Sequence, residues 1–366
     1  MSGYGNQEKL LGECGTSDKP MRVLLTGHKG YIGTVLSGML RKAGHEVHGI
    51  DSDLFCRCTF GTLPSAIPET IKDIRDIELE DVQGFDAVLH LAGLSNDPLG
   101  FLNPGLTFEI NHRASVRLAQ LAKQAQVERF IFSSSCSNYG SASDELLQED
   151  APPNPVTPYG KSKVLVEQDV SALADDNFSP VFLRNATAYG VSPRLRFDLV
   201  LNNLVAWAYT TGKVYLKSAG TAWRPIVHIE DISRAFLAVL NAPREKVHNR
   251  AFNVGVPGEN FRIRELADIV RQTVPGSRVE FAEGASADFR NYRVDCTLLA
   301  RTVPDYRPRW NARRGAVELF DAYRRANISL ADFEGSRFSR LAHLEELIAT
   351  GRVDRTLRAT TQEAAQ

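Results

Sequence analysis

The sequence predicts an α/β fold in which a doubly wound parallel sheet carries a smaller α/β substrate lobe. Three observations lead to this prediction. Short apolar runs alternate with amphipathic stretches from Met21 to about residue 184, the first run ends in a glycine-rich loop, and the regular alternation breaks down afterwards. Strands that alternate with helices form βαβ units, and their right-handed crossovers produce a parallel sheet of the Rossmann type.

The first half of the chain supplies the predicted sheet. Its strands are the apolar runs Arg22–Thr26, Val47–Ile50, Phe85–Leu91, Arg129–Phe132 and Pro180–Leu183. Apolar residues at helical spacing predict the intervening helices, which are Tyr31–Ala43, Asn111–Gln126 and Tyr159–Leu173. Binding sites in such sheets lie at the carboxyl ends of the strands, so the residues that follow each strand are the candidates for function.

The 366 residues suffice for one large α/β unit or for two domains that share an interface. The C-terminal extension is expected to be helical because Leu341, Leu344 and Leu347 recur at helical spacing. The expected divisions are a flexible tail at 1–20, a dinucleotide-binding domain at 21–184 plus about 222–255, a substrate lobe at about 185–221 plus 256–330, and the C-terminal helical extension at 331–366.

Composition and charge exclude several classes of protein. Hydrophobic residues make up 43% and charged residues 24%, which are ordinary globular values. The net charge is −1, so no basic field attracts nucleic acid or an anionic membrane, and neither is expected as a partner. The five cysteines are scattered without the spacing of a metal site, so we expect reduced thiols, a cytoplasmic location and no metal.

A glycine-rich loop follows the first predicted strand and opens a helix. Gly27, Gly30 and Gly33 form a G-x-x-G-x-x-G pattern there. Glycines let the backbone approach a pyrophosphate, and a helix N-terminus favours the negative charge of that group. The alternative interpretation is a simple tight turn between strand and helix.

Asp51 ends the second predicted strand, about twenty residues after the loop. A carboxylate at this place accepts hydrogen bonds from an adenosine ribose and repels the 2′-phosphate of NADP, which favours NAD as the cofactor. Lys29 argues the other way, since a cation in the glycine loop could meet that phosphate. An aspartate that merely starts a loop is the other interpretation of Asp51.

Two further clusters indicate acid–base chemistry. Tyr159 and Lys163 lie four residues apart on a predicted helix and so share one face. An adjacent ammonium would lower the tyrosine pKa from its usual value of about 10, which would let the phenolate accept a proton from a sugar hydroxyl. The serines 133–135 follow a predicted strand, where a hydroxyl could hold the reacting oxygen. An ordinary helix surface and an ordinary polar turn are the alternatives.

These motifs, taken in order, resemble the UDP-galactose 4-epimerase family of extended short-chain dehydrogenases/reductases. The resemblance runs from about Met21 to about Tyr323. It rests on Thr26-Gly-His-Lys-Gly-Tyr-Ile-Gly33, Leu89-His-Leu-Ala-Gly93, Phe132-Ser-Ser-Ser135 with Tyr139-Gly140, Thr157-Pro-Tyr-Gly-Lys-Ser-Lys163, Leu183-Arg184, and Arg224-Pro-Ile-Val-His-Ile-Glu-Asp231.

The resemblance implies roles for particular residues. The catalytic residues would be Ser135, Tyr159 and Lys163. NAD would be lined by Gly27, Gly30, Tyr31, Ile32, Gly33, Asp51, Asp73, Ile74, Leu91, Ala92, Gly93 and Asn111, together with Tyr159 and Lys163. Asp73 would face the adenine. The nucleotide-sugar would contact Ser95, Ser135, Thr187, Asn203, Arg224 and Arg290, where arginine suits bidentate phosphate contacts. For Arg290 a surface cation is the alternative.

The chain departs from the family in two places. Relatives that eliminate water carry an Asp-Glu pair just after the catalytic hydroxyl, whereas this chain has Cys136-Ser137, which disfavours a 4,6-dehydratase. Asn185-Ala-Thr187 replaces the Tyr-Phe-Asn of the galactose epimerase, so the sugar specificity of that enzyme is not carried over.

The resemblance therefore implies an NAD-dependent nucleotide-sugar epimerase that works through a transient keto-sugar. One alternative is a net NAD(P)-dependent reductase or dehydrogenase of a sugar nucleotide. Another is a non-catalytic dinucleotide-binding regulator, which would not need both Tyr159 and Lys163. The family also implies a homodimer, formed by the helix after Asn111 and the helix that carries Tyr159.

Overall fold

A computed structural model describes residues 19–95, 103–286 and 290–360 of the chain. The expected tail at 1–20 lies almost wholly outside the described residues, as do residues 361–366 of the expected extension. In the described parts, no helix is long and apolar enough to cross a membrane.

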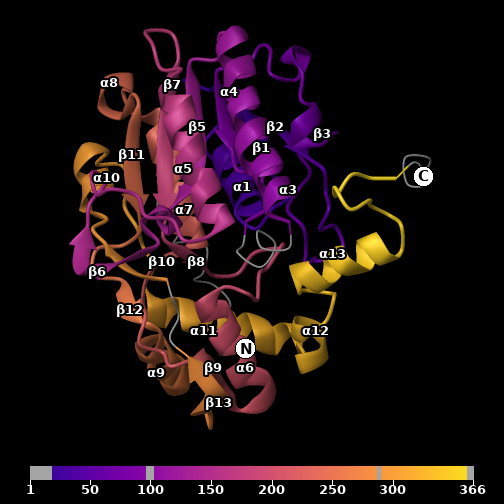
Figure 1. Cartoon of the computed structure of the whole chain (residues 1–366), viewed down its shortest axis with the longest axis vertical. Helices are drawn as coiled ribbons and strands as arrows, with labels where there is room; N and C mark the ends of the chain where they lie inside the picture. Colours follow the sequence, from indigo (N-terminus) through magenta and orange to yellow (C-terminus); the bar gives the residue numbers. More distant parts are fainter. Residues whose placement is uncertain (1–18, 96–102, 287–289, 361–366) are drawn as a thin grey trace, which may run out of the picture.

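A parallel sheet of seven strands forms the centre of the molecule (Figure 1). Its order is β11-β7-β5-β4-β1-β2-β3, and every neighbouring pair is parallel. The strands are β1 (Arg22–Thr26), β2 (Glu46–Asp51), β3 (Glu69–Ile71), β4 (Ala87–His90), β5 (Arg129–Ser135), β7 (Ser179–Asn185) and β11 (Arg250–Val254). Because the chain leaves β1 in one direction and returns to its other side with β4, the sheet has a topological switch point there. The predicted fold class is confirmed.

Helices cover both faces of this sheet. One face carries α1 (Gly33–Lys42), α7 (Ile229–Asn241) and α10 (Thr297–Thr302), with α8 (Arg244–Val247) near β7. The other face carries α3 (Pro104–Phe108), α4 (Ala114–Gln124) and α5 (Pro158–Ser171). A π-helical turn at Glu109–Arg113 joins α3 to α4.

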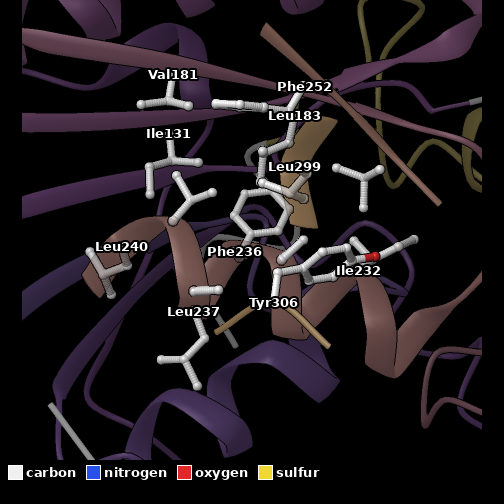
Figure 2. Packing of buried hydrophobic residues seen from close by; sticks show 14 of the residues in the cluster. Ile131, Val181, Leu183, Ile232, Phe236, Leu237, Leu240, Phe252, Leu299 and Tyr306 are labelled. Carbon is white, nitrogen blue, oxygen red and sulfur yellow. The ribbon is translucent and has the colours of Figure 1, made fainter. Parts of the chain in front are cut away.

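Figure 2 shows how α7 and α10 meet on the sheet. Phe236 of α7 lies among Ile131, Val181 and Leu183 of the strands, close to Leu299 of α10. The sequence placed residues 256–330 together in the substrate lobe, but α10 instead packs against β11 of the central sheet. The regular alternation of strands and helices breaks down in this stretch, so the sequence could not tell which core each of its helices joins.

The lobe has its own apolar core and lies beyond the carboxyl ends of the central strands (Figure 1). It contains α6 (Val200–Thr211), α9 (Ile263–Thr273) and α11 (Ala312–Ala326). Its small sheets are β12-β10-β8 and β13-β9, formed by β8 (Thr187–Tyr189), β9 (Lys213–Ser218), β10 (Trp223–His228), β12 (Asn260–Arg262) and β13 (Arg278–Ser286). A further pair joins β6 (Ser141–Leu147) to β14 (Asn291–Val294).

The C-terminal extension consists of α12 (Leu330–Glu334), α13 (Arg340–Ala349) and an irregular segment up to residue 360. Its helix α12 still packs against α6 of the lobe, and the chain then returns to the side of the first domain that carries β2 and β3 (Figure 1). The chain therefore crosses between the two parts of the molecule once more at its end.

Candidate active site

The carboxyl ends of β1, β2, β4 and β5 open onto a cavity of about 810 Å³. The lobe lines the opposite side with residues of α6, β9 and β10. The cavity therefore lies at the switch point of the sheet, where ligands of doubly wound folds bind. All but one of the predicted site residues line it, and the exception is Asn111.

The glycine loop forms one end of the cavity. Gly27 has a φ of +74°, and a Cβ there would lie 2.7 Å from the backbone nitrogen of Ala92. The loop therefore packs tightly on the turn after β4. The N-cap residue of α1, Ile32, has no side chain that could cap the helix, and the first turn holds no acidic residue. The positive end of the α1 dipole therefore faces the cavity without a counter-charge from its own first turn. This arrangement fits the diphosphate of a dinucleotide.

Asp51 lies at the end of β2, as predicted. Its carboxylate accepts hydrogen bonds from the backbone nitrogens of Lys29 at 3.0 Å and Asp53 at 2.8 Å. Burial raises the pKa of Asp51. The ammonium of Lys29 forms ion pairs with Asp53 at 3.0 Å and Glu69 at 3.1 Å. Lys29 is thus already compensated by two carboxylates, which removes the main argument for a 2′-phosphate contact.

Asp73 and Ile74 line the cavity next to Asp51. The Asp73 carboxylate is bound by Arg75, with an Nη2–Oδ2 distance of 2.6 Å. Burial opposes ionisation of Asp73, but the hydrogen bonds from Arg75 outweigh it and lower the pKa of the carboxyl. An adenine contact from this carboxylate would therefore be shared with the guanidinium.

Asn111 differs from the prediction. Its Oδ1 accepts a hydrogen bond from Leu94 N at 2.7 Å and its Nδ2 donates to Leu94 O at 2.9 Å. It is buried behind the cavity wall that Leu91, Ala92, Gly93 and Ser95 form. Asn111 thus holds the loop after β4 in place through both of its side-chain polar atoms.

The local structure of α5 places Tyr159 and Lys163. Thr157 caps the helix by accepting a hydrogen bond from Gly160 N at 3.1 Å, and Pro158 takes the first helical position. Lys163 Nζ lies 5.6 Å from the centroid of the Tyr159 ring and donates to Ser133 O at 2.7 Å. Burial lowers the pKa of Lys163 to about 7, an effect that the charge of Glu167 opposes.

Ser135 is the last residue of β5 and faces the same cavity. Its Oγ lies 3.0 Å from Ser137 Oγ and accepts a hydrogen bond from Ser137 N. Behind it, the Glu167 carboxylate accepts hydrogen bonds from Arg184 Nη2 at 2.7 Å, from Asn138 Nδ2 at 2.8 Å and from Ser134 Oγ. This buried network joins α5 to β5 and β7, and so fixes the helix that carries Tyr159.

The lobe brings Thr187, Asn203, Arg224 and Arg290 to the cavity, as the resemblance implied. Arg224 is buried, donates to Trp223 O at 2.7 Å and contacts Arg290 O. Ser95 accepts a hydrogen bond at 3.1 Å from Arg196, whose guanidinium also pairs with Asp198 at 2.5 Å. The arginines 224 and 290 thus meet on the lobe side of the cavity.

Sequence reasoning missed several residues of the cavity. They include Phe55, Arg75, Ser137, Arg196, Tyr215, Lys217, Tyr292 and Arg340. Ser137 could have been inferred from its place two residues after Ser135. The sequence around Arg340 gave no indication that this residue lines the cavity. Arg340 is the first residue of an amphipathic helix that lies far in sequence from every other site residue.

The chain is similar to known proteins over most of its length. Residues 23–255 match the family "NAD dependent epimerase/dehydratase". A UDP-glucose 4-epimerase of Azospirillum brasilense is 29% identical over 277 residues, which are 70% of this chain and 78% of that protein. A structure of MoeE5 with UDP-glucuronic acid and NAD has a TM-score of 0.73 and 26% identity, covering 83% of this chain and 99% of that one. A UDP-glucose 4-epimerase of Thermus thermophilus in complex with NAD has a TM-score of 0.69 and 25% identity, with 83% and 99% covered.

Proposed function

Because the chain belongs to the NAD-dependent epimerase/dehydratase family, we propose that it is an NAD-dependent epimerase of a nucleotide-sugar that works through a transient keto-sugar. The observation that carries this proposal is the content of one cavity. The glycine loop and Asp51 line one end, Tyr159 and Lys163 line the middle wall with Ser135, and Arg224 and Arg290 line the lobe side.

The residues of this cavity divide the work of the reaction. NAD supplies a hydride acceptor that can also return the hydride. Tyr159 accepts the proton of the sugar hydroxyl and gives it back when the hydroxyl is restored on the other face of the ring. Lys163 donates one of its three N–H groups to Ser133 O. The other two N–H groups remain for hydrogen bonds to the cofactor ribose and to the hydroxyl of Tyr159. Ser135, steadied by Ser137, orients the same sugar oxygen.

The residues next to Ser135 favour epimerisation over dehydration. Elimination of water needs an acid to protonate the leaving hydroxyl. Cys136 is buried and contacts Arg184 O, while Ser137 lines the cavity, so neither position offers a carboxyl group. The absence of an acid at these two positions favours renewed reduction of the keto-sugar, on the same or on the opposite face.

The direct test is a panel of UDP-, dTDP-, GDP- and CDP-sugars, incubated with the protein while NADH absorbance is followed and products are resolved. We expect one of them to be converted into its epimer with no net change in NADH. Net consumption of NAD or NADH would instead identify a dehydrogenase or reductase. If the protein retained NAD but converted none of these sugars, a non-catalytic dinucleotide-binding function would be favoured.

We also propose that the protein is a homodimer. Helices α4 and α5 pack next to each other on an outer face of the central sheet (Figure 1). A symmetric contact between two such pairs closes at two copies. Light scattering of the full chain at micromolar concentration should give twice the mass of 40.5 kDa, and a monomer there would contradict the proposal.

A further inference from the structure

The C-terminal extension closes the side of the cavity next to β2. His343 Nε2 donates to Leu54 O at 3.0 Å, and Arg75 Nη1 donates to Thr356 O at 2.9 Å. Leu357 and Arg340 both line the cavity. The extension is therefore held at two places along the first domain, and the cavity-lining residues Arg340 and Leu357 lie close in sequence to these two contacts.

Arg340 is a buried cation that has no carboxylate partner among the residues that the structure describes. Its side chain is 7% exposed, and its guanidinium lies 4.2 Å from the centroid of the Phe55 ring. Its Nε has no hydrogen-bond partner among the described residues, which offer the guanidinium only a long contact of 3.5 Å from Nη2 to Arg194 O. Within the same described ranges, no carboxylate lies within 4.0 Å of it.

The neighbouring arginines are different. Arg194 pairs with Asp53 at 3.0 Å, and Arg196 pairs with Asp198 at 2.5 Å. Arg340 is also the first residue of α13, where the positive end of the helix makes a cation still less favourable. Burial and the charge of Arg196 lower the pKa of Arg340 to about 10, which leaves it charged at neutral pH. A buried, unpaired charge of this kind calls for an anion.

We propose that Arg340 binds a phosphate oxygen of the cofactor diphosphate, so that residues 339–360 act as a strap that retains the dinucleotide. This proposal rests on the proposed function, because it takes the cavity to hold a dinucleotide. The diphosphate is the anionic part of NAD, and Arg340 lines the cavity on the same side as Asp51 and Phe55. The nucleotide-sugar also carries a diphosphate, so it is the other ligand of this cavity whose phosphate oxygen Arg340 could bind.

The strap also ties cofactor binding to the lobe. It follows α12, which packs against α6 of the lobe, and ends on the first domain. In this proposal, these contacts open when the dinucleotide leaves. This is the behaviour that an epimerase needs, since its cofactor is regenerated within each turnover and has no reason to exchange.

The experiment measures binding of ADP, adenosine and UDP to the cofactor-free full chain by calorimetry. The variant Arg340→Met should weaken ADP binding about ten-fold or more, because it removes a charge-assisted hydrogen bond. Adenosine, which has no phosphate, and UDP should bind within about two-fold of the unmodified protein. Arg340→Lys should recover part of the ADP affinity. Arg337→Met is the matched control, since Arg337 is an exposed arginine of the C-terminal extension, two residues before the strap, and pairs with Asp332.

Melting temperatures without ligand separate a binding role from a structural one. Arg340→Met removes an unpaired buried charge, so the ligand-free variant should melt at the same temperature as the unmodified protein or higher. Unchanged ADP binding would overturn the proposal, and so would an equal loss for ADP and adenosine. Weakened UDP binding would assign Arg340 to the other diphosphate and also overturn it. If the unmodified protein bound neither ADP nor adenosine, the dinucleotide function itself would fail.

Discussion

Two walls of the cavity hold their charged side chains in different ways. The sheet wall carries Ser135, Tyr159 and Lys163, and the C-terminal wall carries Arg340 and Leu357 of the extension. On the sheet wall, Lys163 is fixed by the buried partner Ser133 O, and behind this wall Arg184 is fixed by Glu167. On the C-terminal wall, Arg340 has no such partner among the described residues, and the ion pairs that hold its segment to the first domain are exposed.

This difference separates two tasks. Catalytic groups must hold their geometry before the substrate arrives, which requires a rigid network behind them. A retaining strap must open for its ligand, which requires contacts that are individually weak. The sheet wall therefore serves chemistry, whereas the C-terminal wall is completed only by what binds beneath it. Variants that remove one support from one wall at a time test this division.

The largest effect is expected from Tyr159→Phe on the sheet wall. The change removes one hydroxyl and leaves the ring, so fold and NAD binding should survive. Turnover of the sugar nucleotide should fall by roughly 10²–10⁴-fold, the usual contribution of general acid–base catalysis. Steady-state kinetics with calorimetry of NAD binding will measure both quantities. Full activity in a folded variant would show that Tyr159 is not the proton acceptor, whatever the fold.

Breaking the buried network behind this wall should cost stability. Glu167→Gln leaves the Arg184 guanidinium without its counter-charge, and both side chains are only 11% exposed. We expect the free energy of unfolding to fall by about 3–5 kcal/mol, as for other buried pairs with one partner removed. Urea titration measures this.

The matched control for Glu167→Gln lies on the other wall. Glu346 pairs with Arg57 at 3.4 Å, and the two side chains are 40% and 48% exposed. Glu346→Gln should lower the unfolding free energy by less than about 1 kcal/mol. Equal losses for the two variants would mean that the two walls do not differ in how firmly they are held.

The pH dependence of stability distinguishes the two buried cations. The pKa of Lys163 is about 7 in the folded protein, against 10.5 for the free side chain. Between these values the unfolded chain holds a proton that the folded chain lacks, so the contribution of Lys163 makes stability rise with pH. The slope is at most about 1.4 kcal/mol per pH unit.

Urea titrations of the cofactor-free protein at pH 7, 8 and 9 will test this. Lys163→Met should remove its share of the slope. Arg340→Met should leave the slope unchanged over this range, because the pKa of Arg340 is about 10 and the group stays charged throughout most of it. A slope that survives in Lys163→Met would place the titrating group elsewhere.

The sequence predicted the sheet wall well because its residues follow strands. The strand Arg22–Thr26 was predicted with the bounds that the structure gives it, and the glycine loop, Asp51 and Ser135 all lie at carboxyl ends of the sheet. In a parallel sheet, position along the chain fixes position in space at that edge. Asn111 lies behind the cavity wall, a position that the pattern could not predict because it does not tell which neighbour a polar side chain on a helix meets.

The C-terminal wall could not be predicted by the same reasoning. The apolar spacing of α13 indicates a helix and does not say which surface it packs on. Arg340 meets Arg194 across 146 positions of sequence, and Arg358 meets Asp76 across 282. Contacts of this kind depend on how the lobe docks on the sheet, which no local pattern encodes.

The smallest effect is expected from Arg358→Met at the end of the strap. Arg358 binds Asp76 through both Nη atoms, with Nη2 at 3.0 Å, and the two side chains are 39% and 48% exposed. Water competes for both charges, so the unfolding free energy should fall by less than about 1 kcal/mol, and the difference should shrink in high salt. The variant keeps Arg340 and the backbone contact at Thr356, so the ADP affinity should change by less than about three-fold, well below the change in Arg340→Met. Calorimetry of both variants under one set of conditions makes the comparison. If Arg358→Met weakened ADP binding as strongly as Arg340→Met, the strap would act through its docking on the first domain. Arg340 would then not bind the phosphate directly.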